Sequence, residues 1–148
     1  MKCRWQEIDP DLEPSLGQEL AQARLPTSDI IGAGKRYFSC SDDKGSPLAF
    51  GGWEEIGKDA VLLRSIVVRE KARGRGLGRR VVEHLIETAL GAGKRQLYLL
   101  TMDAADFFAH LGFESLARDE APPALKETAQ FKNLCPSSAA LMRWPLLD

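Results

Sequence analysis

A buried strand followed by a glycine-rich loop and a long helix constrains the fold of this chain more than any other feature. Residues 60–68, AVLLRSIVV, are mostly apolar and β-branched, which is typical of a central strand. Residues 79–90, RRVVEHLIETAL, place their apolar side chains on one helical stripe, and Gly91 follows as a helix terminator. The sequence therefore predicts a strand, a loop and a helix in direct succession.

The loop between them, residues 69–78, has the composition of an anion-binding turn. Gly74, Gly76 and Gly78 let the backbone turn tightly and approach a ligand without interference from a Cβ atom. The loop leads into a helix start, where free amide groups and the helix dipole favour an anion. Residues 69–80 also carry six arginines and lysines. These features predict a site for a phosphate or pyrophosphate group.

The two common nucleotide-binding fingerprints do not fit this loop. A dinucleotide fingerprint that starts at Gly74 needs a glycine at position 79, which is Arg79. A nucleotide-triphosphate loop needs serine or threonine after its lysine, whereas the GAGKR segments at residues 32–36 and 91–95 have arginine there. The pattern that fits is an arginine followed three and five residues later by glycine, starting at Arg73.

The rest of the chain alternates strand and helix patterns without a linker or a low-complexity tract. We therefore expect one domain, residues 1–148, of the α/β (α+β) class with a mixed sheet. Gly51 and Gly52 indicate a bulge or a close backbone approach within one strand. The further strands are expected at residues 3–8, 37–41, 48–56, 96–101, from 113 and at 138–144, and the further helices at 12–25, 104–111 and 123–130.

Composition excludes several classes of protein. The net charge of -1 argues against a general nucleic-acid binder, and no apolar run is long enough to cross a bilayer. The first ten residues lack the apolar core of a signal peptide. Cys3, Cys40 and Cys135 are too few and too scattered for a disulfide framework or a zinc cluster. We expect a cytoplasmic protein with reduced thiols and no metal site.

With the loop motif established, the sequence resembles the GNAT family of acetyl-CoA-dependent N-acetyltransferases. In that family a loop of the same spacing follows the fourth strand and holds the pyrophosphate of coenzyme A. The resemblance runs from about residue 61 to residue 113, and it includes FFAHLGF at residues 107–113, which is similar to the family's aromatic-rich helix. It implies a GNAT-type domain with a mixed, mostly antiparallel central sheet flanked by helices.

A narrower resemblance covers nearly the whole chain. Segments such as LLRS at residues 62–65, ADFF at 105–108 and LCPSSA at 134–139 are similar to small acetyltransferases associated with arsenic resistance in bacteria. This likeness suggests a biological setting, and with it an amino-acid-like or organoarsenical acceptor. It does not name the acceptor.

The family resemblance implies acetyl-CoA as co-substrate. One strand backbone would pair with the pantetheine amides, the loop would hold the pyrophosphate, and the side chains after the next strand would flank the thioester. The amine of a small molecule would then attack the acetyl carbonyl directly in a ternary complex. The residues expected to bind acetyl-CoA are Ile66, Val67, Val68, Arg73, Gly74, Arg75, Gly76, Leu77, Gly78, Arg79, Thr101, Phe107 and Phe108.

Two residues depart from the family pattern. Thr101 stands where many members have asparagine, and Phe108 stands where many have a tyrosine that protonates the leaving thiolate. Since phenylalanine cannot donate a proton, another group or water acts, or the thiolate leaves unassisted. A thiol pKa of about 8.5 makes unassisted departure chemically reasonable.

Arg64 is unusual because a central strand seldom carries an arginine without a reason. Period-two alternation expects its side chain on the face of Ile66, where it would bind an anionic group of the acceptor bidentately. Glu54 is the second substrate-binding candidate, and Glu54 and Ser65 are the catalytic candidates, with Glu54 acting as a base through water. A cross-strand ion pair between Arg64 and Glu54 is an equally weighted structural alternative.

Other readings stay open at this point. The aromatic residues of segment 107–113 are expected in the core first, His84 on the solvent face of its helix, and Cys135 as a small buried hydrophobe. Besides an enzyme, the chain could be a non-catalytic acyl-CoA-binding or sensing module, or a basic-loop nucleic-acid partner. For the enzyme we expect a small-molecule amine, no nucleic acid and no membrane as partners, and we consider a homodimer through the C-terminal strand.

Overall fold

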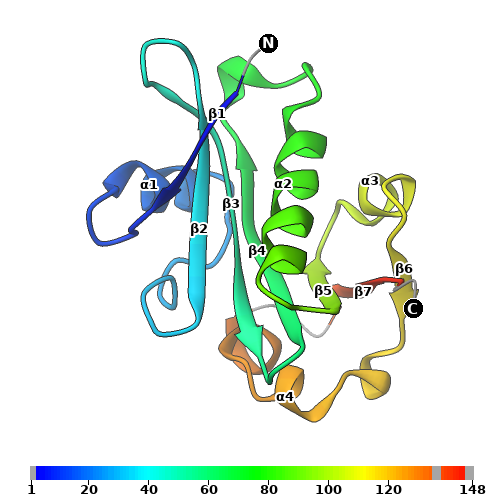
Figure 1. Cartoon of the computed structure of the whole chain (residues 1–148). Coiled ribbons are helices and arrows are strands. Elements are labelled where there is room, and N and C mark those ends of the chain that lie inside the picture. The colour runs from blue at the N-terminus through cyan, green and yellow to red at the C-terminus, as the bar shows by residue number, and fades with distance from the viewer. Residues whose placement is uncertain (1–2, 135–137, 146–148) are drawn as a thin grey trace.

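The computed structural model describes residues 3–134 and 138–145, and seven strands of this part form one mixed sheet in the order β1-β2-β3-β4-β5-β7-β6 (Figure 1). Only β4 and β5 are parallel, and every other neighbouring pair is antiparallel. The strands are β1 (Arg4–Ile8), β2 (Lys35–Ser41), β3 (Pro47–Ile56), β4 (Ala60–Val68), β5 (Gln96–Thr101), β6 (Glu114–Leu116) and β7 (Ala140–Trp144).

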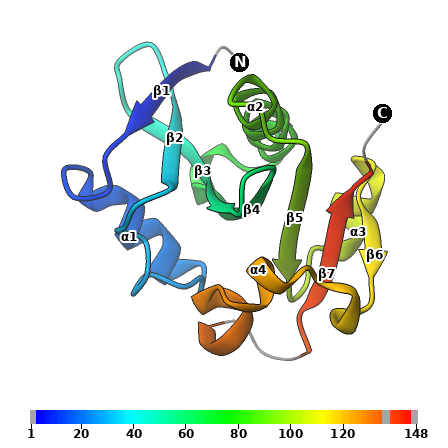
Figure 2. The same cartoon turned by 60° about the horizontal axis from the view of Figure 1, so that its bottom comes forward.

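Helices cover both faces of the sheet (Figures 1 and 2). One face packs against α2, whose Val81 and Leu85 share a buried cluster with Trp53 of β3. The other face packs against α1, through Leu16 and Leu20, and against α4. The helices are α1 (Pro14–Gln22), α2 (Leu77–Gly91), α3 (Ala105–His110) and α4 (Pro123–Lys126), joined by the short turns η1 (Glu70–Ala72), η2 (Arg118–Glu120) and the π-helical η3 (Gln130–Leu134).

The two adjacent glycines of β3 lie where the sequence indicated a close approach. A Cβ atom on Gly51 would lie 2.5 Å from Val81 of α2, and one on Gly52 would lie 2.5 Å from the Tyr37 ring. The β3–β4 register also shifts at this point. The predicted close approach is therefore confirmed, whereas the extra residue of the irregularity lies on β4 and not on the glycine strand.

The helix expected over residues 123–130 is shorter than predicted. The α4 helix ends at Lys126, and the Thr128 hydroxyl donates back to the Leu125 carbonyl (2.8 Å) while accepting from the amide of Phe131 (3.2 Å). Because this side chain takes over backbone partners, the chain leaves the α4 axis and starts η3 at Gln130. This turn places Gln130 next to Arg64 of β4, at the cavity described below.

The prediction of reduced thiols is wrong for two of the three cysteines. Cys3 and Cys40 form a disulfide, because the antiparallel pairing of β1 with β2 brings their Cα atoms to 5.0 Å. The spacing of 37 residues in the sequence gave no sign of this proximity. Cys135 lies outside the described residues.

The expectation that His84 faces solvent is also wrong. Its ring stacks on Trp5 at 4.1 Å and meets the edge of Phe38 at 5.1 Å, and it is half-buried. The reason is that β1 and β2 extend the sheet beneath α2, so a wider helix face is covered than the apolar stripe alone indicates. Burial lowers the pKa of His84 below its usual value of 6.5, although Glu87 acts in the opposite direction.

Within residues 3–134 and 138–145, no helix has the length and apolar character needed to cross a membrane. The same residues hold no cluster of three or more histidine, cysteine, aspartate or glutamate side chains suited to a metal ion.

Candidate active site

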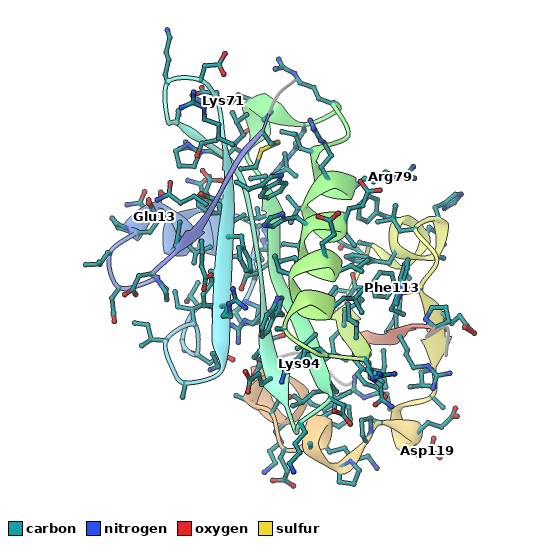
Figure 3. The ribbon with its side chains drawn as sticks, viewed as in Figure 1. Glu13, Lys71, Arg79, Lys94, Phe113 and Asp119 are labelled. Atoms are coloured by element: carbon teal, nitrogen blue, oxygen red, sulfur yellow. A yellow bond between two sulfur atoms is a disulfide. The ribbon has the colours of Figure 1, made fainter. Side chains whose placement is uncertain are left out.

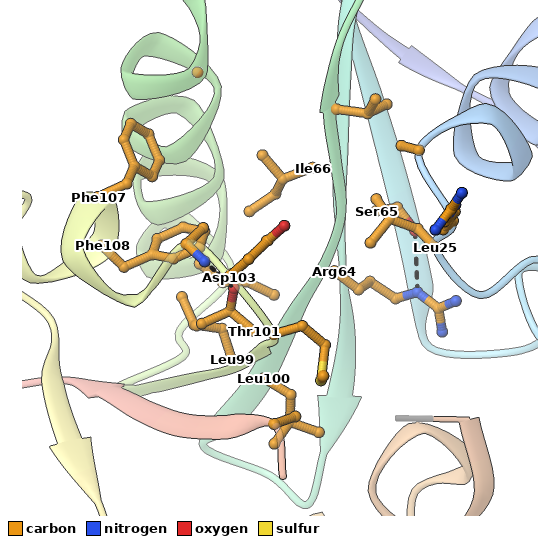
Figure 4. Close-up of a pocket in the computed structure, with 18 of the residues that line it drawn as sticks. Leu25, Arg64, Ser65, Ile66, Leu99, Leu100, Thr101, Asp103, Phe107 and Phe108 are labelled. Carbon is orange, nitrogen blue, oxygen red and sulfur yellow. Dashed lines mark hydrogen bonds between the residues drawn. The ribbon is translucent and has the colours of Figure 1, made fainter. Parts of the chain in front are cut away.

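The parallel strands β4 and β5 separate partway along their length. They pair only from Ala60 with Gln96 to Leu63 with Leu99, whereas β4 continues along β3 as far as Val68. Within the described residues, the edge of β4 from residue 64 to residue 68 therefore has no strand partner on the β5 side. A cavity of about 870 Å³ opens there, mostly between β4, the end of β5 and the start of α3 (Figure 4).

A bulge at Ser65 changes which side chains of β4 face this cavity. Ser65 has a φ of 59°, and Ser65 and Ile66 together lie opposite the single residue Gly51. As a result Ile66 belongs to the α2 face, whereas Arg64 and Val67 lie toward α1 and β2. Figure 4 shows Arg64 and Ile66 on opposite sides of the strand. The expectation that they share a face is wrong, because the extra residue interrupts the period of two.

The start of α2 offers an uncapped set of amide groups beside the cavity. Gly76 holds the N-cap position in the left-handed region, with φ 78° and ψ 13°, and no side chain in the described part of the protein caps the helix. The first turn of α2 contains no acidic residue. The helical hydrogen bonds begin with the amide of Arg80, which donates to the Gly76 carbonyl. A Cβ atom on Gly76 would meet no atom within 4 Å, so the space outside this turn is open.

These features suit a pyrophosphate. The amides of Leu77, Gly78 and Arg79 have no intrahelical acceptor, and the positive end of the helix dipole points the same way. Gly74, with a φ of 80°, helps turn the loop toward this helix end. The predicted loop residues are thus brought together around one helix start.

The basic side chains of the loop divide into two groups. Arg69 is structural, because its Nε donates to Glu19 of α1 at 2.8 Å. Arg73 lines the cavity while its Nε donates to the Val68 carbonyl at 3.1 Å. Arg79 contacts Glu83 at 3.5 Å on the surface, and Figure 3 shows it with Lys71 at the end of the molecule where α2 begins. Of these basic side chains, Arg73 is the one placed at the cavity beside the helix start.

Three predicted residues lie along the α3 side of the cavity. Thr101 lines it, and its hydroxyl accepts from the amide of Ala104 at 3.1 Å, which fixes the turn into α3. Phe107 is 39% exposed and lies against Gly78, where a Cβ atom would come within 3.3 Å of its ring. Phe108 also lines the cavity, but it is mainly a core residue packed edge-on against Phe113. Phe107 and Phe108 therefore line the cavity from Gly78 at the start of α2 along the side of α3.

The Arg64 guanidinium has partners within the protein on each of its nitrogen atoms. Asp29 receives two hydrogen bonds, from Nη2 at 2.6 Å and from Nη1 at 2.8 Å. Nη1 also donates to Glu54 at 3.1 Å, and Nε donates to Ser65 at 3.3 Å. The side chain is 0% exposed and lies over the Tyr37 ring at 5.9 Å. Arg64 is thus a buried structural centre.

The electrostatics of this cluster follow from its geometry. Burial alone would raise the pKa of Asp29, but the hydrogen bonds and charge of Arg64 outweigh burial and hold that pKa below its usual value. Desolvation likewise acts to lower the pKa of Arg64, and the partners that favour its charge raise it overall. Burial raises the pKa of Tyr37 to about 12, and its hydroxyl is buried without a hydrogen-bond partner in the described structure. Both members of the ion pair therefore stay charged.

The arrangement around Arg64 favours the structural alternative over the predicted anion site. Asp29 occupies the bidentate position expected for an acceptor anion, and the structural alternative, a cross-strand pair with Glu54, is present. Glu54 is 8% exposed and is not among the described residues that line the cavity, so its position does not support a role as base. Ser65 does line the cavity.

Sequence reasoning missed three residues of this region. Asp29 lies in a segment that could only be read as a loop, and Gln130 follows a turn whose course depends on tertiary contacts. The one available signal was Arg64 itself, because a buried guanidinium calls for more than one carboxylate or amide partner. Asp103 was missed as well, and among the described residues it is the acidic one that lines the cavity, to which Ile66 and Phe108 also belong (Figure 4).

Comparison with known proteins gives three informative matches. The chain is 44% identical over 55 residues to N-alpha-acetyltransferase 80 of Mus musculus, covering 37% of this chain and only 18% of that protein. It is 31% identical over 108 residues to glucosamine 6-phosphate N-acetyltransferase 1 of Oryza sativa subsp. japonica, covering 68% of this chain and 66% of the relative. Its structure matches N-acetylglutamate synthase from Neisseria gonorrhoeae, solved with coenzyme A and L-arginine, with a TM-score of 0.81 at 17% identity over 99% of this chain and 34% of that one.

The curated relatives mentioned are longer than the matched segments, and the mouse protein is covered for less than a fifth of its length. The structural match, at its low identity, shows the fold. The sequence model of a whole family gives the firmer result, because a model described as an acetyltransferase (GNAT) domain matches residues 33–115. This match spans more than half of the chain and includes β4, the glycine loop, α2, β5 and α3, so the chain belongs to the GNAT acetyltransferase domain family.

Proposed function

We propose that this protein is an N-acetyltransferase that moves the acetyl group of acetyl-CoA to the amine of a small molecule. The observation that carries the proposal is the separation of β4 from β5 beside an uncapped helix start with a left-handed glycine. One arrangement thereby offers an unpaired strand edge, a set of free amides and a cavity between them. An extended chain that ends in a pyrophosphate matches all three.

The residues divide the binding of acetyl-CoA, which supplies an activated acetyl group as a thioester. The strand edge at Ile66, Val67 and Val68 would pair with the amide groups of the pantetheine arm, as an added strand would. The amides after Gly76 would hold the pyrophosphate, with Arg73 near it at the cavity wall. Thr101, Phe107 and Phe108 would flank the sulfur end. This division makes direct attack by the amine in a ternary complex the proposed course of the reaction.

In this chain the residues supply alignment first and proton transfer second. Backbone donors at the β4 bulge would stabilise the negative charge that develops on the acetyl oxygen. Asp103 replaces Glu54 as the candidate to accept the proton of the attacking amine, because its carboxylate lines the cavity. Ser65 keeps its predicted catalytic role as a proposal, since its hydroxyl lies at the bulge and lines the cavity. Phe108 cannot protonate the leaving thiolate. The thiolate therefore takes its proton from water or leaves unprotonated.

The nature of the acceptor is the finer part of the proposal. We retain a small amine that bears an anionic group, but its support moves from Arg64 to Arg24. Arg24 lines the acceptor end of the cavity, is exposed, and has no ion-pair partner among the described residues. The narrower likeness to arsenic-resistance-associated acetyltransferases, and with it an organoarsenical acceptor, stays a prediction. The cytoplasmic location, the absence of nucleic-acid and membrane partners, and a homodimer stay predictions too.

Release of free thiol from acetyl-CoA tests the proposal. The panel contains L-glutamate and glucosamine 6-phosphate as acidic amines, spermidine as an amine without an acidic group, and an arsenical amino-acid analogue. We expect amine-dependent thiol release that saturates with acetyl-CoA and is faster with the acidic amines. Best turnover with spermidine would remove the anionic-acceptor proposal and leave the transferase.

The same assay separates the alternative functions. Saturable acetyl-CoA binding without thiol release for a broad amine panel would favour the non-catalytic acyl-CoA-binding module, for which Phe108 is the structural argument. A melting temperature that does not rise with excess acetyl-CoA would contradict both, since a ligand bound by the native state must stabilise it.

A further inference from the structure

Three segments that surround the acceptor end of the cavity meet at one buried side chain, Arg64. Asp29 comes from the loop between α1 and β2, Ser65 from the bulge of β4, and Gln130 from η3. With its amide oxygen turned toward Arg64, Gln130 accepts from Nε at 3.3 Å and from Nη2 at 3.2 Å. Arg64, Ser65 and Gln130 all line the cavity as well. The Arg64 guanidinium therefore contacts three separate segments around the acceptor end of the cavity: the α1–β2 loop, the β4 bulge and η3.

The loop after α1 depends strongly on this guanidinium. Residues 23–26 line the cavity, and the chain returns to the sheet only at Lys35 in β2. Among the described residues, Asp29 makes the polar contacts that join residues 26–33 to the sheet. Its carboxylate binds Arg64 in a fork, and its carbonyl accepts from the Lys35 ammonium at 2.5 Å. The wall itself is also bonded to the end of α1 through the amides of residues 23–25, so Asp29 fixes the far side of the loop whose near side forms the wall.

We propose that Asp29 and Arg64 form a buried clamp that holds residues 23–26 in place as the wall against which the acceptor amine is aligned. The inference rests on the proposed transferase function and adds positioning residues to it. Neither member acts on the reacting atoms, since Asp29 does not line the described cavity and every nitrogen of Arg64 is engaged within the protein. Asp29 is the member on the acceptor side, because it lies in the loop between α1 and β2, whereas the proposed acetyl-CoA loop at residues 73–79 lies at the start of α2.

The test uses Asp29→Asn, which keeps the size of the side chain and removes its charge. Weakening the fork should loosen the wall, and a misplaced wall should raise the KM of the acceptor about tenfold or more, because small errors of alignment are costly. The KM of acetyl-CoA should stay within about twofold, because the polar contacts of Asp29 go to Arg64 and Lys35 and not to the residues proposed to bind acetyl-CoA. Amide hydrogen exchange of residues 24–34 should speed up, while exchange in β4 and β5 stays unchanged.

Glu7→Gln is the matched control. Glu7 and Arg36 also form a two-bonded ion pair, at 2.7 and 3.0 Å, but this pair is exposed and lies between β1 and β2. The control should change neither KM nor the exchange of residues 24–34. Arg64→Lys gives a second variant of the clamp itself, since an ammonium cannot reproduce the fork, and it should shift the acceptor KM in the same direction as Asp29→Asn.

The outcomes separate the clamp from the proposed function. If the unaltered protein shows no amine-dependent thiol release, the transferase proposal fails, and the exchange of residues 24–34 in Asp29→Asn alone decides whether the clamp holds the loop. If the unaltered protein turns over and Asp29→Asn changes both KM values equally, or neither, with unchanged loop exchange, the clamp is overturned. Should Arg64→Lys fail to fold, Asp29→Asn carries the test, because Asp29 lies in the loop between α1 and β2 rather than in a central strand.

Discussion

At the residue scale, the binding loop depends on a backbone conformation that favours glycine. Gly76 and Gly45 both have a positive φ, 78° and 82°, and a Cβ atom on either would meet no neighbour within 4 Å. They differ in place, since Gly76 caps α2 beside the cavity and Gly45 lies in the turn between β2 and β3. Comparing substitutions at these two glycines therefore separates the loss of stability caused by backbone strain from the loss of acetyl-CoA binding.

Gly76→Val should abolish tight binding of acetyl-CoA, whereas Gly45→Val should not. A valine in the left-handed region costs about 1–3 kcal/mol of stability in either variant. At Gly76 it also fills the space at the amides, and losing one charge-assisted hydrogen bond of about 1.5–3 kcal/mol weakens affinity roughly ten- to hundredfold. Calorimetric titration with acetyl-CoA measures this. Equal affinity for acetyl-CoA in the two variants would contradict the proposal that this loop binds the pyrophosphate.

Phe108→Tyr should leave the rate of acetyl transfer unchanged or raise it. The ring is 7% exposed and lines the cavity, so an added hydroxyl can point along the wall toward the leaving sulfur. A phenol there would supply the proton that phenylalanine cannot. Thiol-release kinetics and a melting curve are the two measurements. A large loss of rate in a folded variant would show that the ring is matched sterically to the acetyl group.

His84 should make stability depend on pH below 6.5. Burial beneath β1 and β2 lowers its pKa in the folded state, so the unfolded chain binds the proton more readily. The contribution of His84 to the free energy of unfolding is then fully present above pH 6.5. It is lost as the pH falls from 6.5 through the lower pKa of the folded state. Urea unfolding between pH 5 and 8 measures the slope. His84→Phe keeps an aromatic ring against Trp5 and should flatten the curve in that range, and an unchanged slope in this variant would assign the dependence to other groups.

At the element scale, much of the fold follows from periodicity, and the exceptions have physical causes. The apolar run of β4 and the amphipathic stripe of α2 are strong local signals, and both elements lie where the sequence predicts them. The Ser65 bulge gave no such signal, because it arises from the pairing of β4 with β3 around Gly51. One extra residue reverses the side-chain direction, which is why Arg64 does not share the face of Ile66 as the sequence predicted.

The same limit explains the N-terminal strand. Its pairing with β2 creates both the Cys3–Cys40 disulfide and the Trp5–His84 stack, and neither partner is near in sequence. Long-range pairings of this kind are set by tertiary structure rather than by local propensity. The loop glycines, in contrast, could be assigned from sequence because their spacing and charge are local.

Reduction of the Cys3–Cys40 disulfide should lower the stability of the protein. A cross-link that closes a loop of this length typically contributes about 2–4 kcal/mol, mainly by restricting the unfolded chain. Melting curves with and without reductant test this, with Cys3→Ser as the control. Reductant should lower the melting temperature of the unaltered protein and leave Cys3→Ser unchanged. Equal responses would mean that the bond does not form in solution.

At the scale of the whole molecule, the single GNAT-type fold brings the site together from distant parts of the chain. The sheet carries the opening between β4 and β5, α2 directs its free amides to one end, and the α1–β2 loop and η3 close the other. The proposed cofactor half of this site is assigned from one continuous segment of sequence, and that assignment stays a prediction. The acceptor half could not be assigned in this way, because Asp29, Arg64 and Gln130 meet only through the tertiary fold.

A crystal structure of the protein with coenzyme A tests the central claim most directly. The account predicts the pyrophosphate within hydrogen-bond distance of the amides of residues 76–79, and the pantetheine arm along the free edge of β4 at residues 66–68. The thiol should end between Thr101, Phe108 and the Ser65 bulge, with room left toward Arg24. Coenzyme A bound elsewhere on the molecule, with the space between β4 and β5 empty, would contradict the account.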